Sequence, residues 1–488
     1  MSSNVLPSSE EELFHPTVHG TQDSDAESQL DVESFVDEPP NETDSPIEPG
    51  IRVAFFIFGC ALLLPWNELI TATPYFLSRL SGSSYQSTFA SYLSTSFTAT
   101  SLLVFIYTTA TSTQASPARR IYISSVILAF LTFLLAMTTF THTSRTIFVS
   151  FVLTNSVLQA TANAYLQPAV IALASLFGPT AIGATMSGQG AVGVLVSLVQ
   201  VLSATASVSW GGSPVTPSAP NEDGAAEARS AFTFLALSTL FLISVVTIFA
   251  WLTGQPAYKA VIAPFEHRQR RARSLSASLT ETEGLMSRGQ PSDTKGQIMR
   301  VAKANITYEI AVTYVYIVTL SVFPAITTSI MSTGPAVHPL LFSAYHFLVF
   351  NIGDFVGRTI PMNPRFVTWS AKRILTLSLA RTLFIPLFLM CNLQRATAGT
   401  VATPIISSDV VYMLLLFAFG SSSGYVSSVC IMSASSLEHN PRLKGRKEDV
   451  AVAATLAIFC LIAGLAFGSV SSFAVRSVVC DCNPFKQS

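Results

Sequence analysis

Long apolar segments recur along the chain and are separated by shorter polar ones. The segments lie near 51–77, 86–109, 120–140, 146–175, 180–206, 230–253, 302–327, 338–361, 371–392, 409–430 and 449–479. A helix of about 20 residues crosses the hydrocarbon core of a bilayer, about 30 Å thick. Because lipid offers no partners for open backbone groups, we expect these segments to be helices. The pattern predicts an all-α integral membrane protein with 11 transmembrane helices.

The polar stretches between these segments predict how the chain is divided. We expect an acidic, disordered tail over 1–50, six helices over 51–253, a basic loop over 254–300, five helices over 301–479 and a short tail over 480–488. The boundary between the fourth and fifth helices rests on Phe177-Gly178-Pro179 alone. We expect a tight turn there, and a kink within one long helix is the alternative.

Composition supports a membrane protein, and the distribution of Lys and Arg predicts its orientation. Half of the 488 residues are hydrophobic and only 11% are charged, which is outside the range of ordinary soluble domains. Lys and Arg gather in the loops after the second, sixth, eighth and tenth helices, and the loop after the seventh has none. Since cytosolic loops are rich in Lys and Arg, we expect a cytosolic N-terminus and a luminal or extracellular C-terminus.

Two soluble segments have distinctive charge. The first fifty residues contain 13 Asp and Glu and no Lys or Arg, and such a composition cannot bury enough apolar surface to fold. In the loop, Arg270–Ser276 places hydroxyls beside arginines, as in kinase acceptor sites. A basic cytosolic linker without a regulatory role explains the same residues.

The polar residues of the eighth apolar segment are the strongest candidates for a site. Ionised groups inside a membrane are costly unless they pair or line a watered cavity, so an acid and a base there indicate function. At helical spacing four side chains share one face: Phe347, Asn351, Asp354 and Arg358. Their carboxylate, guanidinium and amide can converge on one polar solute. The structural alternative is a buried ion pair that only holds helices together.

The first and fifth helices carry further polar or small residues. In the first, Pro65 interrupts the helix beside Trp66, Asn67 and Glu68, an arrangement typical of the broken helices at transport sites. The fifth begins with Ser187-Gly188-Gln189 in a run of small residues. Small residues allow helices to pack closely, and also to slide or rock during gating.

Enzymatic and metal chemistry have no support in the sequence. The seven histidines have no metal-ligand spacing, and we find neither a phosphate-binding glycine loop nor a serine nucleophile motif. Four cysteines lie in apolar segments, and Cys480-Asp481-Cys482 is too small for a structural zinc site. We therefore expect no enzyme activity, no cofactor and no nucleic-acid partner.

These motifs together resemble the equilibrative nucleoside transporters. The resemblance rests on Leu64-Pro65-Trp66-Asn67, Met186–Gly190 and Phe350–Arg358, and on Arg381 with Pro386 and Cys391-Asn392, Phe417-Ala418-Phe419 with Gly424-Tyr425, and Gly464–Phe473. It covers the whole membrane region. It implies a fold similar to the major facilitator architecture, with two helical bundles that rock about a central site.

The resemblance also implies roles for individual residues. Leu63 and Trp66 would border the nucleobase, Gln167 would hydrogen-bond it, and Asp354 and Arg358 would hold the ribose hydroxyls. Further expected substrate contacts are Asn67, Phe347 and Asn351, and expected packing or gating residues are Ser187, Gly188, Gln189 and Arg381. For Gln167, a hydrogen bond that bridges neighbouring helices is the structural alternative.

Several functions are compatible with these residues. The expected function is facilitated diffusion of nucleosides, or also nucleobases, by a monomer in the plasma membrane or a vacuole-like membrane. Glu68 stands where relatives usually carry an apolar or aromatic residue, so proton-coupled symport at an acidic organelle is an alternative. A facilitator of another small polar solute and a receptor or scaffold without transport are the others.

Overall fold

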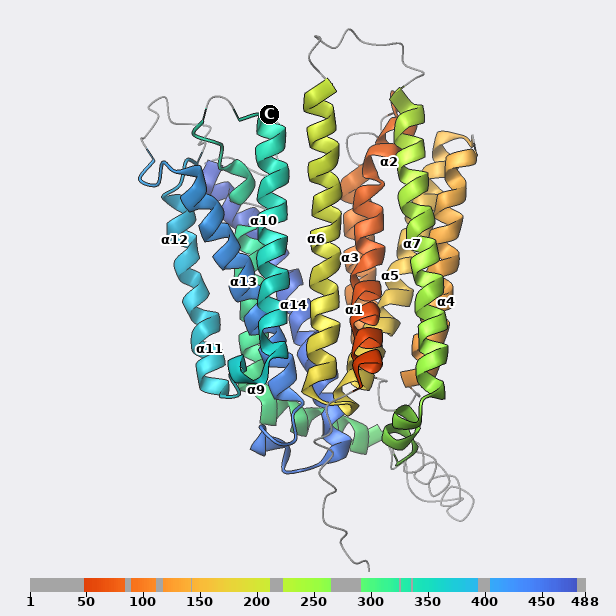
Figure 1. The fold of residues 1–488 in the computed structure, drawn as a ribbon, viewed down its shortest axis with the longest axis vertical. Coiled ribbons are helices and arrows are strands. Elements are labelled where there is room, and N and C mark those ends of the chain that lie inside the picture. The colour runs from red at the N-terminus through yellow and green to blue at the C-terminus, as the bar shows by residue number, and fades with distance from the viewer. Residues whose placement is uncertain are drawn as a thin grey trace, which may run out of the picture. The chain divides into compact units, whose positions relative to one another are not determined.

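The protein is helical throughout its described parts (Figure 1). The computed structural model describes residues 48–83, 89–110, 117–141, 143–210, 223–264, 291–323, 326–334, 337–393 and 404–480. Within these residues the only β-structure is an isolated bridge between Ile330 and Leu393. The predicted all-α membrane fold is confirmed.

The first half of the chain follows the expected segments closely. Its helices are α1 (Pro49–Thr71), α2 (Thr73–Arg79), α3 (Phe89–Ala110), α4 (Pro117–Met137), α5 (Arg145–Leu176), α6 (Pro179–Trp210) and α7 (Asp223–Gly254). The first expected segment is divided at Ala72, where α1 ends and α2 begins; the interruption expected at Pro65 is wrong, because α1 continues through that residue. Gly178 has a φ of +93° between α5 and α6. Glycine adopts this conformation easily, and the predicted tight turn is confirmed.

The second half departs from expectation at two places. Its helices are α9 (Pro291–Val322), α10 (Pro339–Thr359), α11 (Ala371–Ala380), α12 (Phe384–Leu389), α13 (Asp409–Ala434) and α14 (Lys447–Cys480). The basic loop was expected to extend to residue 300, but α9 already begins at Pro291, a residue that suits a helix start. The first turns of α9 are polar, so hydropathy did not reveal them. Between α11 and α12, a 3₁₀ turn at Arg381–Leu383 interrupts the ninth expected helix.

The number of membrane-crossing helices stays a prediction. Eight helical spans of the described residues are long and apolar enough to cross a membrane: α1 with α2, α4, α5, α6, α7, α9, α13 and α14. The expected crossings at α3, at α10 and at the pair α11 and α12 are not among these long apolar spans. In α10, Asp354 and Arg358 themselves lower the mean hydropathy.

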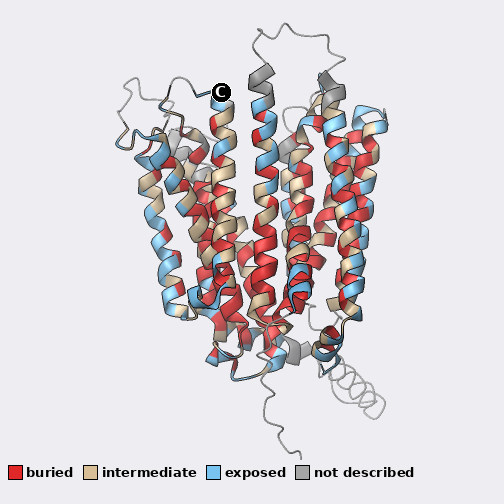
Figure 2. Ribbon diagram, viewed as in Figure 1, coloured by how far each residue is buried: buried red, intermediate tan, exposed pale blue. Residues whose placement is uncertain are grey.

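Helix packing joins the two halves of the chain. Within the first half, α1 packs on α6, and α4 packs on α5 and α7. Within the second half, α9 packs on α14 and α10 on α13. The halves meet where α6 lies along α10 and where α14 contacts α5 and α3. Buried residues gather in the lower part of α1 and α6 as drawn in Figure 2.

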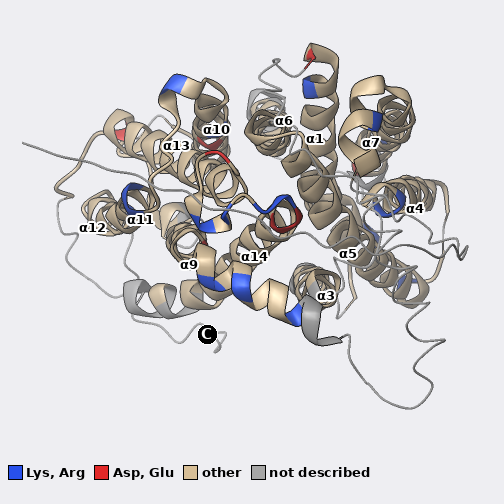
Figure 3. Ribbon diagram, turned by 90° about the horizontal axis from the view of Figure 1, so that it is seen from below, with Lys and Arg blue, Asp and Glu red and all other residues tan. Residues whose placement is uncertain are grey.

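Charged residues lie mostly at one end of the helices. Viewed from below in Figure 3, Lys and Arg occur on and beside α9, α11 and α14. This end includes the exposed side chains of Lys303, Arg365, Lys372, Arg373 and Arg442. The acidic segment before residue 48, the Arg270–Ser276 cluster and the tail after residue 480 lie outside the described residues.

Candidate functional site

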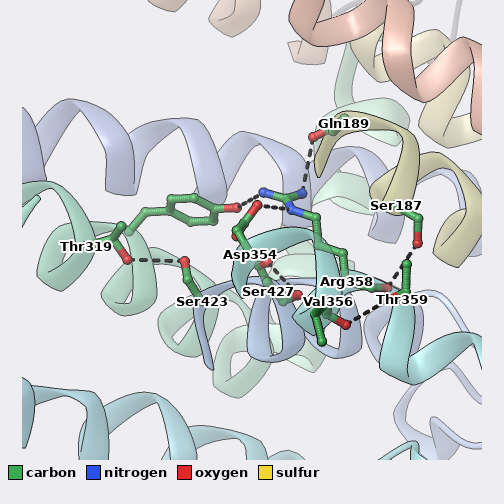
Figure 4. Close-up of polar contacts among 11 residues, drawn as sticks. Ser187, Gln189, Thr319, Asp354, Val356, Arg358, Thr359, Ser423 and Ser427 are labelled. Atoms are coloured by element: carbon green, nitrogen blue, oxygen red, sulfur yellow. Dashed lines mark hydrogen bonds and ion pairs between the residues drawn. The ribbon is translucent and has the colours of Figure 1, made fainter. Parts of the chain in front are cut away.

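An ion pair within α10 is the centre of the candidate site (Figure 4). The Nε of Arg358 lies 2.6 Å from Oδ2 of Asp354, one helical turn away. The side chains are only 9% and 13% exposed, respectively. Two charges taken out of water are costly, and close pairing with further hydrogen bonds offsets that cost. The sequence predicted this juxtaposition correctly.

Two other helices supply polar partners for the same guanidinium. Arg358 donates from Nη2 to the hydroxyl of Tyr316 on α9 at 3.1 Å and from Nη1 to Oε1 of Gln189 on α6 at 3.5 Å. Both partners are buried. The predicted polar residue of the fifth helix, Gln189, therefore belongs to this site. Its Nε2 has no hydrogen-bond partner among the described residues.

Four glycines bring α10 and α13 into backbone contact beside the ion pair. A Cβ built on Gly424 would collide with the carbonyl oxygen of Asp354, and one on Gly357 would collide with that of Ser421. Gly353 and Gly420 face the opposite helix in the same way. Glycines at these positions permit the close crossing. The position of Asp354 and Arg358 is therefore set by the backbone of α13.

The seam between α6 and α10 is made of small and polar residues. Ser187 donates to the Arg358 carbonyl at 3.2 Å, and Nδ2 of Asn351 donates to the Ser197 hydroxyl at 2.6 Å. A Cβ on Gly193 would lie 2.8 Å from Oδ1 of Asn351. The expected site residue Asn351 thus also fixes the first half of the chain against the second.

Gly188 lies at the contact between α6 and α1, not at the contact between α6 and α10. A Cβ there would collide with the carbonyl oxygen of Phe56, and one on Gly59 with that of Thr185. Gly188 therefore permits close packing of α6 on α1, as the packing reading predicted.

Arg381 forms a second buried cationic centre in the second half of the chain. It is 1% exposed. Its guanidinium donates to the Phe419 carbonyl and to Thr319 Oγ1, each at 2.9 Å, and also to the Ser422 hydroxyl. The guanidinium carbon lies 4.5 Å from the centre of the Phe419 ring, a cation–π contact. Arg381 therefore ties the interrupted ninth segment to α9 and α13.

Phe347 lies at the apolar end of the predicted α10 face. Its ring is 5.3 Å from that of Phe323 and 4.8 Å from that of His346. Phe323 also stacks on Phe350 at 3.9 Å. These rings give the site an aromatic border on the side away from Arg358.

The expected residues of the first half lie on α1 and α5. Trp66 packs against Phe97 of α3 with ring centres 5.0 Å apart, and Asn67 donates to the Leu63 carbonyl at 2.8 Å. Gln167 is partly buried and precedes Pro168 inside α5. The hydrogen bonds and ring contacts of the described residues do not connect these side chains with the ion pair.

Glu68 lies on the other side of α1 from Trp66. Its carboxylate is completely buried and accepts a hydrogen bond from Thr132 of α4 at 2.8 Å. Successive helical residues are about 100° apart, so Glu68 and Trp66 lie on nearly opposite sides of α1. This carboxyl group therefore belongs to the interior of the first-half helices.

Sequence reasoning missed the contribution of α9. Tyr316 and Thr319 bond to the two buried arginines, and Ser423 of α13 lies 3.3 Å from the Thr319 hydroxyl. The available signal was the polar stripe at Glu309, Thr313, Tyr316 and Thr319, which repeats at helical spacing. Hydroxyl groups are common in membrane helices, so the stripe gained meaning only from its arginine partners.

Metal binding has no support in the described residues. No group of three or more His, Cys, Asp or Glu side chains among them could hold a metal ion. The polar chemistry of the site consists of one carboxylate, two guanidinium groups, amides and hydroxyls. Such groups recognise a polar organic solute through hydrogen bonds.

Comparison with known proteins identifies a matching family and several relatives. The family model described as "Nucleoside transporter" matches residues 152–477. Equilibrative nucleoside transporter 1 of Homo sapiens is 25% identical over 471 residues, which cover 88% of this chain and 97% of the human protein. Equilibrative nucleoside transporter 2 of Homo sapiens is 25% identical with the same coverage, and equilibrative nucleoside transporter 3 of Rattus norvegicus is 26% identical over 86% of this chain and 87% of the rat protein.

Similarity to solved structures is weaker. The E. coli fucose:proton symporter FucP gives a TM-score of 0.48 at 13% identity and covers 88% of this chain and 96% of its own. The proton:xylose symporter XylE, of the major facilitator superfamily, gives a TM-score of 0.45 at 11% identity, with coverage of 88% and 95%.

Proposed function

The chain belongs to the nucleoside transporter family, and on that premise we propose that it moves nucleosides across a membrane by facilitated diffusion. The family assignment and the apolar helices make it a multi-pass membrane transporter of nucleosides. The passive mode is our proposal. The observation that carries the substrate site is the buried Asp354–Arg358 pair, which has partners from α6 and α9.

The chemistry of this pair suits a ribose. Vicinal hydroxyls donate to a carboxylate, and their oxygens accept from a guanidinium. We assign these roles to Asp354 and Arg358. Tyr316 and Gln189 hold the guanidinium while substrate enters and leaves.

The remaining contacts are proposed from the family resemblance and the chemistry of the side chains. An indole offers an apolar face to a nucleobase and an amide offers both a donor and an acceptor to its edge. Trp66 and Leu63 border the base, Gln167 hydrogen-bonds it, and Asn67, Phe347 and Asn351 complete the proposed binding residues.

Alternating access is proposed to operate through the α6–α10 seam. The seam consists of Ser187, Gly193, Ser197, Asn351 and the backbone at Arg358. Small residues can separate and return without deep interlocking of side chains. Gln189 and Arg381 brace the site on either side of this movement, and Gly188 keeps α6 with α1.

Orientation follows from the distribution of basic residues. The exposed Lys and Arg at the end seen in Figure 3 support a cytosolic location for that end and for the start of α1. We propose membrane bundles over 51–253 and 301–479, with 480–488 outside. Residues 1–50 and 254–300, which include the polar first turns of α9, lie in the cytosol in this proposal. We further propose that a monomer suffices, without cofactor or enzyme activity, in the plasma membrane or a vacuole-like membrane.

Two other transport functions are candidates: a different coupling mode and a different substrate. The buried Glu68 favours proton-coupled symport at an acidic organelle as the second candidate. A different small polar solute is the third, because a fold does not determine its substrate.

Uptake of labelled adenosine and uridine into proteoliposomes tests the proposal. The wild-type protein should show saturable uptake without a proton gradient, and Asp354→Asn should lose it while keeping the side-chain shape. The matched control is Asp449→Asn, which breaks the 2.9 Å ion pair with Arg300 at the end of the helices, away from the site. Glucose and monoamines should not compete. No uptake by folded wild-type protein, or equal uptake by Asp354→Asn, contradicts the proposal.

A further inference from the structure

Glu68 is a buried acid that the proposed substrate site does not use. Its exposed fraction is 0%. Thr132 of α4 donates to Oε2 at 2.8 Å, Ser238 of α7 lies beside the carboxylate, and Oε1 has no hydrogen-bond partner among the described residues. An ionised carboxylate without a cationic partner is costly in such surroundings. Burial of this kind disfavours the ionised form, and Oε1 is the oxygen that lacks a hydrogen-bond partner among the described residues.

No charged side chain compensates Glu68 from the helices packed around it. Helix α6 contains no ionisable residue. The described charged groups on the other surrounding helices stand nine or more residues away from the residues that face Glu68, about 13 Å along a helix axis. They are Arg52 on α1, Arg79 on α2, Arg119 and Arg120 on α4, Arg145 on α5 and Glu227 and Arg229 on α7. The titratable groups Cys60 and Tyr75 are each about two turns away on α1 and α2, and Tyr75 donates to the Thr138 carbonyl.

Four amide side chains on α5 lie in a row that runs from the neighbourhood of Thr132 towards the proposed base contact. Asn155 donates to the carbonyl of Leu131 at 3.0 Å, directly before Thr132 on α4. Oδ1 of Asn155, both amide atoms of Gln159 and Oδ1 of Asn163 are buried without a hydrogen-bond partner. Gln167 follows at the same spacing of four residues, which makes successive side chains neighbours on a helix. Buried polar groups of this kind can bind internal water, and this row of amides spans the distance along α5 between the neighbourhood of Thr132 and a proposed base contact.

We propose that Glu68 is a proton-binding site that controls the transport cycle. The carrier operates with Glu68 protonated, and loss of the proton stops it. An ionised carboxylate would need water or a cation between α1, α4 and α7 and would force these helices apart. Because α1 also carries Trp66 and Asn67, the same displacement disturbs the substrate contacts. This inference rests on the proposed nucleoside transport.

The test is uptake with equal pH on both sides of the proteoliposome, from about pH 5.5 to about pH 9. Wild-type uptake should fall by about tenfold per pH unit above a midpoint, as expected for one controlling proton. Glu68→Gln mimics the protonated form and should transport at a rate independent of pH. The matched control is Glu448→Gln, which replaces an exposed acid at the start of α14 and should keep the wild-type profile.

Thr132→Val gives an independent readout if Glu68→Gln fails to fold. The Thr132 hydroxyl stabilises the ionised form by donating to Oε2. Its removal should move the midpoint of the profile to higher pH, whereas a purely structural defect would lower uptake equally at every pH.

A pH-independent wild-type protein, a Glu68→Gln profile like that of the wild type, or an unmoved midpoint in Thr132→Val overturns the proton site. Loss of all uptake in the wild type instead refutes the nucleoside proposal. Accumulation driven by a proton gradient and abolished in Glu68→Gln would support the site and replace the passive mode by symport.

Discussion

The glycine crossing between α10 and α13 offers a sharp test of how the substrate site is held. In Gly424→Ala, the new methyl group would collide with the Asp354 carbonyl oxygen and lie 2.9 Å from the Arg358 amide nitrogen and 3.0 Å from its Cγ. Comfortable contacts of a methyl carbon need about 3.5 Å or more. Two of these three neighbours are backbone atoms, so a rotamer change cannot relieve the collision. Helix α10 must move by at least about half an ångström, and the ion pair moves with it.

Overpacking of this kind costs about 1–3 kcal/mol. We expect Gly424→Ala to lower the thermal stability of the purified protein in detergent and to reduce adenosine uptake per folded molecule by at least about tenfold, which corresponds to 1.4 kcal/mol. Gly183→Ala is the matched control. Its methyl group would meet Met362 and Met432 side-chain atoms at 3.5 Å and 3.6 Å, which are ordinary contacts. Wild-type uptake and stability in Gly424→Ala would refute the view that the backbone crossing positions the ion pair.

Two further substitutions separate substrate binding from packing. Tyr316→Phe removes the hydroxyl that accepts from Arg358 at 3.1 Å. A hydrogen bond to a charged group contributes about 1.5–3 kcal/mol, so the KM for nucleoside should rise about tenfold or more, and an unchanged KM would contradict the role of Tyr316. Arg381→Lys cannot reproduce the planar set of bonds to α9 and α13. It should lower the melting temperature while folded protein keeps most of its uptake, and equal stability to the wild type would exclude the bracing role.

The membrane segments were predictable because apolar length has a direct physical meaning. Each expected segment corresponds to one or more helices, and Gly178 ends α5 as expected. The start of α9 at Pro291 was not predictable from hydropathy, since a helix that extends beyond the lipid can be polar. The 3₁₀ turn at Arg381 was also hidden, because it depends on partners in α9 and α13 that are remote in sequence.

Contacts within one helix of the candidate site were predictable from the sequence, and contacts between helices were not. Helical spacing placed Asp354 beside Arg358 correctly. It could not show that Tyr316 completes the site, since that contact joins positions 42 residues apart. For Glu68, the proline, the indole and the amide beside it pointed to one shared polar cluster. The structure separates Glu68 from the indole of Trp66, because residues two positions apart lie on nearly opposite sides of a helix.

The seam between α6 and α10 has a consequence for the populations of the carrier's conformations. Apart from the Gln189–Arg358 hydrogen bond, its polar contacts come from Ser187, Ser197 and Asn351 beside Gly193, side chains with little apolar area. Opening such a seam exposes little hydrophobic surface, and water can replace its few hydrogen bonds at a net cost of about 0.5–1.5 kcal/mol each. We infer that the open and closed seams differ by only a few kcal/mol, so that both are populated at equilibrium. For the passive carrier that we propose, this balance means that neither conformation traps the protein, so net flux can proceed in either direction as the nucleoside gradient dictates.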